Sequence, residues 1–518
     1  MDNTEKLVFG KAGVKGVVGL EVADDTAEVF VQDKDGGISS VFVSNRFWIL
    51  SNKNLNGKFA KLKGDLHYNW GTQFKDRATW SKCRGAWKKS DDIYTIWSEQ
   101  EALMTKDGIC YYQGLNPKDV SVLSFDLETT GLDPSNENAK IVLISNTFRS
   151  LKGKETKLFS YDEYETEADM LLDWCQWICD KDPSILTGHN IFGFDIRYLL
   201  GRADSCGITL NIGRDGSALT PHEYTSSFRI DGSRDMEFTN VKCYGREVID
   251  TMFLSYRYDA VKKKYDSYGL KSIIKTEGLE KEGRTFYDAS QIRYKYKDPE
   301  EMKKIKEYCI DDADDALALF DLMCPAYFYQ SQSTTRSFQH LHISATGALI
   351  NGILVRSYLQ EGHSIPKADQ LEKLEGGISF AIPGVYRNLV KIDLKSAYPS
   401  QVLRFKLFDK SKDPEGNFYK LVKYFTEQRF HYKKMNKQTG DKKWEDLDAS
   451  GKIFINSAYG ACSTNGLNFN SPEVAAKITL ETRNVIDLAL KWSSGRGKDY
   501  WMDLFKSITK GETEDESV

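Results

Sequence analysis

Short segments in which hydrophobic and polar residues alternate dominate the first part of the chain. The runs VKGVVGLEVADDTAEVFVQD and SVFVSNRFWILS are separated from their neighbours by Gly, Asn and Asp residues. A period of two between turn residues is typical of β-strands. The pattern therefore predicts a β-rich N-terminal domain over residues 1–117, to which we also assign residues of about 326–368.

From Val120 onward, strand patterns and helix patterns alternate. The runs VSVLSFDLETT, KIVLISNTF and SILTGHN predict strands, and residues 167–179 predict a helix. Another helix is expected after the lysine-rich run KYKDPEEMKKIKEY, ending near Leu322. Because such alternation is typical of α/β folds, residues 118–325 are predicted to form a separate α/β domain.

The composition is that of a soluble multidomain protein. At 518 residues the chain is too long for one ordinary core, so about two to four domains are expected. Hydrophobic residues make up 40% of the chain and charged residues 28%, unlike a disordered or membrane protein. No apolar run is long enough to span a bilayer and no signal peptide opens the chain. We therefore expect a cytoplasmic location and no membrane partner.

The cysteine and histidine residues do not indicate a structural metal. The nine cysteines include no CxxC pair, and Cys175 and Cys179 are the most closely spaced. Reduced thiols packed in cores are the expected state. His340 and His342 have no neighbouring carboxylates or thiols in the sequence, so packing or a surface position is expected for them.

Positive charge is concentrated in one part of the chain. The formal net charge is −4, but between Tyr386 and Lys443 there are fifteen Lys or Arg against six Asp or Glu, which leaves +9. Binding to an anionic ligand depends on where the charges lie rather than on their total. The distribution therefore favours an anion-binding surface in this segment.

Acidic residues in three separate elements indicate a first candidate site. Asp126 and Glu128 lie two apart on a predicted strand and so share one face, although such a pair alone is more often a solvated edge. Asp195 begins an amphipathic helix after a strand, and Tyr308 and Asp312 are one helical turn apart. Carboxylates that converge in this way suit two Mg²⁺ ions, which can promote phosphodiester hydrolysis. The neighbouring Asp311, Asp314 and Asp315 are expected on the solvated side of their helix.

These segments resemble a known nuclease family. DLETTG, the run from TGHN to GFD, and YCIDDA are similar to the three exonuclease motifs of the DEDDy nucleases, in the spacing that family B DNA polymerases use. The resemblance implies an RNase H-like 3′–5′ exonuclease domain. It also implies that Asp126, Glu128, Asp195 and Asp312 bind two Mg²⁺ ions, with Tyr308 orienting the attacking water. In the same domain, Asp250 and Lys271 are expected to be structural rather than catalytic.

A second set of motifs lies nearer the C-terminus. In LVKIDLKSAYPSQV a β-branched strand is predicted to end at Asp393, before a tight turn. The run resembles motif A of family B polymerases. The resemblance implies that Asp393 and the Leu394 backbone bind metal, that Ser396, Ala397 and Tyr398 bind the nucleotide, and that Tyr398 excludes ribonucleotides. Upstream, EGGISFAIPGVY resembles the family's turn between exonuclease and palm, which implies that Gly376 and Gly377 contact the template backbone.

Two helices with polar faces are predicted next. Arg429 and Lys433 lie four apart, as do Lys452 and Asn456, and Tyr459 follows one turn later. The polar run NKQTGDKK between them predicts two antiparallel helices, whose facing side chains would bind a triphosphate. KIFINSAYG resembles motif B, which implies polymerase fingers at residues 416–464, flanked by a partial palm at 369–415 and 465–518.

One expected motif does not occur in the 518 residues. Motif C, a Tyr-x-Asp-Thr-Asp-Ser hairpin, is absent, as is a thumb, and the acidic C-terminal tail is expected to be frayed. A two-metal polymerase site cannot be assembled from Asp393 alone. We favour the large subunit of a split, phage-type polymerase whose second polypeptide supplies motif C and the thumb. A stand-alone exonuclease with a vestigial polymerase half, a non-catalytic nucleic-acid-binding protein, and a truncated single-chain polymerase remain alternatives.

The predicted fold class is therefore multidomain, α/β and α+β. It combines an RNase H-like exonuclease domain with a β-rich N-terminal domain, a partial palm and two-helix fingers. The expected ligands are primer-template DNA, deoxynucleoside triphosphates and Mg²⁺, with two ions in the exonuclease site and two in the completed polymerase site. A sliding clamp is a further candidate partner.

Overall fold

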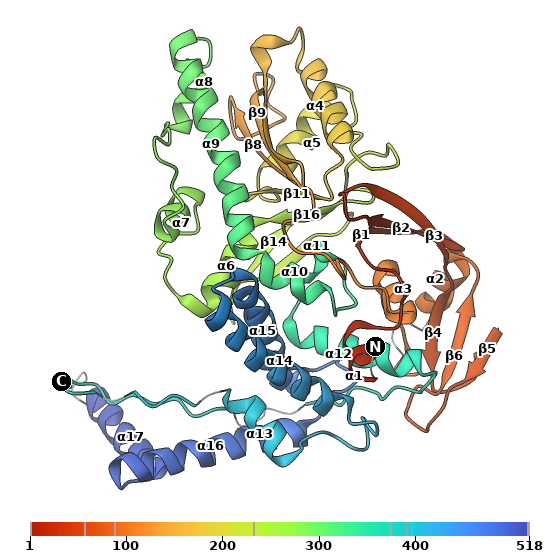
Figure 1. Ribbon diagram of the computed structural model, residues 1–518, viewed down its shortest axis with the longest axis vertical. Coiled ribbons are helices and arrows are strands. Elements are labelled where there is room, and N and C mark those ends of the chain that lie inside the picture. The colour runs from red at the N-terminus through yellow and green to blue at the C-terminus, as the bar shows by residue number, and fades with distance from the viewer. Residues whose placement is uncertain are drawn as a thin grey trace.

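The computed structural model describes residues 3–514 except 56–57, 88–89, 232–233, 372–375, 390 and 395. Of the acidic tail expected to be frayed, the residues up to Glu514 are helical, and 515–518 lie outside the described residues. Figure 1 shows an upper α/β part, a β-rich part beside it, and helices below. The predicted mixed multidomain fold class is confirmed.

The N-terminal part contains two small sheets, as its alternating pattern predicts. Strands β1 to β3 form an antiparallel meander, and the second sheet has the order β5-β6-β4-β7. The strands are β1 Val17–Val22, β2 Thr26–Gln32, β3 Ile38–Ser44, β4 Phe47–Ser51, β5 Lys58–Lys61, β6 Trp70–Phe74 and β7 Ile93–Tyr94, and the helices are α1 Asn3–Phe9, α2 Arg77–Ala86 and α3 Glu99–Asp107.

A five-stranded sheet of order β10-β9-β8-β11-β16 organises the α/β part. Strands β8, β11 and β16 are parallel, whereas β9 and β10 are antiparallel to their neighbours. The three strands expected from the sequence are present, and β10 and β16 extend the sheet on either side. The strands are β8 Val122–Thr129, β9 Ile141–Ser150, β10 Gly153–Ser160, β11 Ile185–Gly188 and β16 Glu247–Asp250, with the short pairs β12 Thr220–Pro221 and β15 Val241–Lys242, and β13 Ser226–Arg229 and β14 Asp235–Phe238.

Helices cover this sheet from two sides. In Figure 1, α9 runs along one side and α4 and α5 lie on the other. Helix α9 starts where the sequence directs it, because Asp298 accepts hydrogen bonds from the Glu300 and Glu301 amides and Pro299 occupies the first turn. The helices are α4 Glu167–Lys181, α5 Asp195–Ser205, α6 Thr251–Lys262, α7 Leu270–Glu277, α8 Ile292–Lys295 and α9 Pro299–Met323, with 3₁₀ turns at Tyr161–Glu163 and Ala289–Gln291.

The remaining helices follow in the lower part of Figure 1. Helices α14 and α15 form the predicted antiparallel pair, which packs against α10 and α12. One buried apolar cluster joins this pair to α10–α12 and the N-terminal sheets, and a second lies between the five-stranded sheet and α4 and α5. The helices are α10 Pro325–Ser331, α11 Phe338–Ile343, α12 Thr346–Gln360, α13 Ala397–Phe405, α14 Asn417–Thr439, α15 Lys442–Ser463, α16 Pro472–Ser494 and α17 Lys498–Glu514.

The strand expected before Asp393 is not formed. The described residues between 376 and 394 have no helix or strand, and the side chains of Leu389 and Ile392 are exposed. A strand needs a neighbour to satisfy its backbone N–H and C=O groups, and no described strand pairs with this segment. β-branched residues alone were therefore a misleading signal here.

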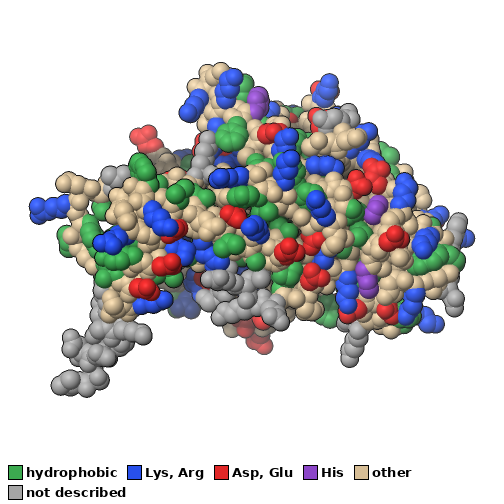
Figure 2. Space-filling view, turned by 90° about the horizontal axis from the view of Figure 1, so that it is seen from below, with side chains coloured by type: hydrophobic (Ala, Val, Ile, Leu, Met, Phe, Trp, Pro, Cys, Tyr) green, Lys and Arg blue, Asp and Glu red, His purple; other side chains and the backbone are tan. Residues whose placement is uncertain are grey.

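Apolar side chains are also exposed on the last two helices. Seen from below, the left-hand part of the molecule, where α16 and α17 lie, shows hydrophobic side chains among Lys and Arg (Figure 2). Leu488 and Trp492 of α16 are 67% and 82% exposed. Among the described helices, none combines the length and hydrophobicity needed to cross a bilayer.

Candidate active site

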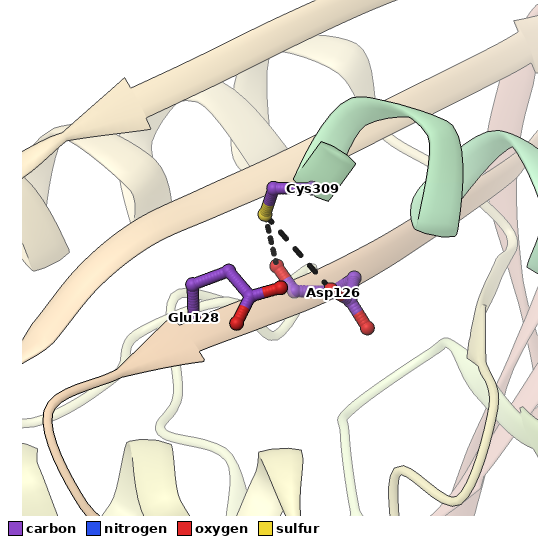
Figure 3. Close-up of side chains that lie close together, drawn as sticks. All are labelled: Asp126, Glu128 and Cys309. Carbon is purple, nitrogen blue, oxygen red and sulfur yellow. Dashed lines mark hydrogen bonds between the residues drawn. The ribbon is translucent and has the colours of Figure 1, made fainter. Parts of the chain in front are cut away.

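Strand β8 presents two carboxylates on one face. Asp126 is half-buried and Glu128 is buried, while Leu127 between them faces the core. Ligand atoms of Asp126, Glu128 and Cys309 all lie within 4.8 Å of one another (Figure 3). Cys309 comes from α9, and its Sγ lies 3.9 Å from Asp126 Oδ2. The sequence interpretation missed Cys309, because no local pattern links it to β8.

Cys309 is not suited to bind a metal. Burial, and then the nearby Asp126 and Glu128 carboxylates, raise the pKa of its thiol well above the usual range. The thiolate rather than the thiol is the metal-binding form. Without a metal the thiol is therefore expected to stay protonated. Mg²⁺ also prefers oxygen donors to sulfur, so the oxygen atoms of the cluster are the candidate ligands.

Asp195 approaches β8 from the first turn of α5. It is 4% exposed, and its Oδ1 accepts a hydrogen bond of 3.2 Å from the Leu127 amide. The preceding loop is held by Asp250, which accepts hydrogen bonds from the Asn190 amide at 2.8 Å and the Phe192 amide at 3.2 Å. Asp250 thus has the structural contacts that the sequence interpretation expected.

Tyr308 and Asp312 reach the same centre from α9. Both are buried, and they lie one turn apart as predicted. The Lys271 ammonium contacts the Tyr308 hydroxyl and lies 3.8 Å from Asp312 Oδ2. Lys271 was expected to be structural only, but its charged end lies within the site. The contact joins residues far apart in sequence, so no local pattern could reveal it.

The prediction for the other aspartates of α9 was wrong. Asp311 and Asp315 are buried rather than solvated. Asp311 pairs with Lys281 at 3.1 Å, and Asp315 pairs with Arg284 at 2.7 Å. Asp314 is half-buried and pairs with a lysine of β10 at 2.9 Å. The loop after α7 covers this side of α9, which helical periodicity alone cannot predict.

The four predicted carboxylates form one electrostatic unit. Burial, followed by the Asp312 carboxylate, raises the pKa values of Asp126 and Glu128 well above the usual range. Burial is also the main cause that raises the pKa of Asp195 to about 8. Buried like charges oppose one another's ionisation, and a divalent cation among them would reverse this effect. The oxygen donors and their shared repulsion therefore fit Mg²⁺.

The segment that carries β8 and α5 is similar to a known protein family. Residues 79–273 match the family model described as "DNA polymerase family B, exonuclease domain". This part of the chain is thus similar to the exonuclease domain of family B DNA polymerases. The matched range ends before α9 and includes Asp126, Glu128, Asp195 and Lys271. Tyr308 and Asp312 lie outside it, on α9, and the fold brings them to the other residues of the site.

Similarity to DNA polymerases extends over a larger part of the chain than this domain. The chain is 24% identical over 414 residues to "DNA polymerase" of Thermococcus sp. (strain 9oN-7), covering 72% of this chain and 51% of that protein. It is 26% identical over 315 residues to "DNA polymerase delta catalytic subunit" of Arabidopsis thaliana, covering 55% and 28%. The chain thus spans about half the length of these archaeal relatives.

A solved structure shares the fold. The family B DNA polymerase from the archaeon Pyrobaculum calidifontis superposes with a TM-score of 0.70 at 17% identity. The match covers 91% of this chain and 71% of that one. The likeness therefore extends from the exonuclease domain into the helices below it.

Removal of the Asp195 charge is expected to stabilise the metal-free exonuclease domain at high pH. The pKa of Asp195 is about 8 in the folded protein and 3.8 ordinarily, so the folded state binds the proton more tightly than the unfolded state. The resulting contribution to the free energy of unfolding is complete below about pH 4 and is lost as the pH rises through 8. Asp195→Asn should thus raise the free energy of unfolding at pH 9 in EDTA by at least about 1.4 kcal/mol, the equivalent of one pKa unit. Thermal denaturation from pH 4 to 9 measures this.

A matched substitution on the same helix provides the control. Asp204 is exposed on α5, so Asp204→Asn should leave the pH profile of stability unchanged. A constant difference between Asp195→Asn and wild type across this pH range would contradict the assignment of Asp195 to the acidic centre.

The motifs below the exonuclease domain meet around two tyrosines. The rings of Tyr398 on α13 and Tyr459 on α15 lie 5.0 Å apart. A Cβ placed on Gly377 would lie 3.2 Å from the Tyr398 hydroxyl, and Arg483 of α16 donates a 3.3 Å hydrogen bond to the Gly376 carbonyl. The fold therefore brings together three segments predicted separately, and adds Arg483.

The basic faces of α14 and α15 differ from the prediction. Arg429 is buried, and its Nε donates a 2.8 Å hydrogen bond to Asp448 of α15. Lys433 Nζ lies 4.0 Å from the same carboxylate, whereas Lys452 and Asn456 are exposed. The four polar residues do not form one open face, because Asp448 draws Arg429 into the helix interface.

Asp393 lies on the irregular segment before α13. Its side chain is exposed, and Leu394 is half-buried. Ser396 has φ 51° and precedes Ala397, the first residue of α13. Within the part of the chain that the structure describes, the one group of three or more potential metal ligands is that of Asp126, Glu128 and Cys309. The described residues therefore do not surround Asp393 with further acidic ligands.

Proposed function

We propose that this chain is part of a family B DNA polymerase and that its exonuclease domain removes nucleotides from the 3′ end of DNA. The observation that carries the proposal is the convergence of buried carboxylates from β8, α5 and α9 with Tyr308. Such a constellation suits hydrolysis of a phosphodiester with divalent ions. Removal of mispaired 3′ nucleotides during DNA replication is the role that fits it.

In this proposal Asp126, Glu128, Asp195 and Asp312 hold Mg²⁺. When bound, two such ions activate water and stabilise the leaving oxygen. The remaining residues of the centre orient the reactants. Burial, followed by the Asp312 and Glu128 carboxylates, raises the pKa of Tyr308 far above its usual range. Its hydroxyl therefore stays protonated and can hydrogen-bond an attacking water.

Lys271 supports this arrangement. Its ammonium contacts the Tyr308 hydroxyl and lies over the ring, 4.1 Å from the centroid. The contact limits rotation of the phenol, and the ammonium adds a positive charge beside the Asp312 carboxylate. We therefore assign to Lys271 the positioning of Tyr308.

Nucleotide addition is a second candidate function. It is favoured by the contact between Tyr398 and Tyr459 and by the proximity of Gly376 and Gly377 to them. We propose that Asp393, Leu394, Ser396 and Ala397 contribute the first part of a polymerase site, and that Lys433, Lys452 and Asn456 reach a nucleotide. Further carboxylates would come from another polypeptide or from more of this one. The predicted fingers at residues 416–464 and the predicted partial palm at 369–415 and 465–518 belong to the same proposal.

The polarity of degradation tests the proposed exonuclease. With Mg²⁺, the purified chain should shorten a 5′-labelled single strand stepwise from its 3′ end. A phosphorothioate at the last 3′ linkage should slow the reaction, whereas the same modification at the first 5′ linkage should not. Equal protection by both modifications, or internal cleavage, would contradict the proposal.

A further inference from the structure

A buried arginine lies on the far side of the acidic centre. Arg284 belongs to the loop between α7 and α8, and its side chain is 1% exposed. Each nitrogen of its guanidinium has an acceptor. Nε donates to Asp315 Oδ2 at 2.7 Å, Nη1 donates to the Thr285 carbonyl at 2.9 Å, and Nη2 pairs with Asp312 Oδ1.

The two oxygens of Asp312 therefore face different cations. Oδ1 pairs with Arg284, and Oδ2 faces Lys271 at 3.8 Å. The orientation of this carboxylate therefore depends on both cations, and Arg284 is the more deeply buried of the two, with 1% of its side chain exposed against 39% for Lys271.

Attachment of the loop to α9 does not require the contact with Asp312. Asp311 already holds the loop, because its carboxylate pairs with Lys281 at 3.1 Å and accepts a 2.8 Å hydrogen bond from the Thr285 amide. Asp315 provides a further anchor for Arg284. A planar guanidinium that bridges two carboxylates fixes both in orientation, which a single ion pair does not.

We propose that Arg284 is the internal counter-cation and positioning residue of the exonuclease centre. With no divalent ion bound, its guanidinium balances Asp312. When an ion binds the other side of the carboxylate, Arg284 remains anchored on Asp315 and keeps Asp312 in the orientation that nucleotide release requires. The inference rests on the proposed metal-dependent exonuclease function.

The proposal predicts a stability loss that depends on Mg²⁺. Arg284→Met leaves two buried carboxylates without their partner, so in EDTA the melting temperature should fall by roughly 5 °C or more. Mg²⁺ would replace part of the lost positive charge. The stabilisation by Mg²⁺ should therefore be larger in Arg284→Met than in wild type, whereas an arginine that only packs the loop would give the same loss in both conditions.

Two further variants separate charge from packing. Arg284→Lys keeps one positive charge but cannot bridge both carboxylates, so its response to Mg²⁺ should be intermediate, and it remains informative if Arg284→Met does not fold. Lys281→Met removes a lysine of the same loop that pairs with Asp311. Its melting temperature should show the same Mg²⁺ response as wild type.

Thermal denaturation of the full chain in EDTA and over a series of MgCl₂ concentrations gives the result. The Mg²⁺ concentration for half-maximal stabilisation should be several-fold lower in Arg284→Met, because a competing cation has been removed, while its maximal rate of nucleotide release should fall. Equal Mg²⁺ responses of wild type, Arg284→Met and Arg284→Lys would overturn the role of Arg284. Absence of any Mg²⁺ response in wild type would instead count against the metal centre itself.

Discussion

Substitution of both Asp126 and Glu128 by alanine is expected to lower Mg²⁺-dependent release of 3′ nucleotides by at least about 10³-fold, equivalent to roughly 4 kcal/mol of lost catalysis. The two residues supply neighbouring carboxylates from one face of β8, and the described residues contain no second group of three or more potential metal ligands that could replace them. Single-turnover cleavage of a labelled oligonucleotide measures the rate. DNA affinity, measured by fluorescence anisotropy, should change little.

The matched control lies on the loop that follows β8. Asp133 and Glu137 are exposed, so the double substitution Asp133→Ala with Glu137→Ala removes the same charges away from the centre. Its rate should equal that of wild type. If the Asp126 and Glu128 variant kept more than about a tenth of the activity, the activation free energy would have changed by less than about 1.4 kcal/mol. That result would show that hydrolysis occurs elsewhere.

If, as proposed, another polypeptide supplies the further carboxylates, primer extension is expected only in its presence. The segments that resemble motifs A and B meet at Tyr398 and Tyr459, but the described residues place no acidic cluster around Asp393. A mixture of this chain with the product of the adjacent reading frame should extend a primer that neither extends alone. The chain should carry Asp126→Ala and Glu128→Ala, so that degradation does not mask synthesis.

Asp393→Asn should abolish extension in that mixture. Asp499→Asn, an equivalent change at an exposed residue of α17, should leave it intact. Extension by this chain alone would refute dependence on a partner, and extension by the Asp393→Asn mixture would refute the metal-binding role of Asp393.

Periodicity predicted the parts of the site that local geometry controls. Asp126 and Glu128 share a face because side chains alternate along a strand, and Tyr308 and Asp312 share one because they are a turn apart on a helix. The α/β order of the domain could be predicted for the same reason. These features need no knowledge of what packs against the element.

Contacts between distant segments could not be predicted in this way. Arg284 reaches Asp312 from a loop, and Asp448 draws Arg429 out of the expected basic face. The strand predicted before Asp393 failed for a related reason, because a strand depends on neighbours that its own sequence does not specify. Buried charges on helices were likewise mistaken for solvated ones, since their partners lie elsewhere in the chain.

In the proposed function, the carboxylates of β8, α5 and α9 together hold divalent ions. Anomalous scattering from crystals of the chain soaked with Mn²⁺, a substitute for Mg²⁺, can locate such ions. Anomalous density is expected between Asp126, Glu128, Asp195 and Asp312, at an oxygen distance close to the roughly 2.0–2.1 Å of Mg²⁺. If the centre stayed empty at saturating Mn²⁺, or if Mn²⁺ bound at another group of residues, the proposed metal site would be wrong.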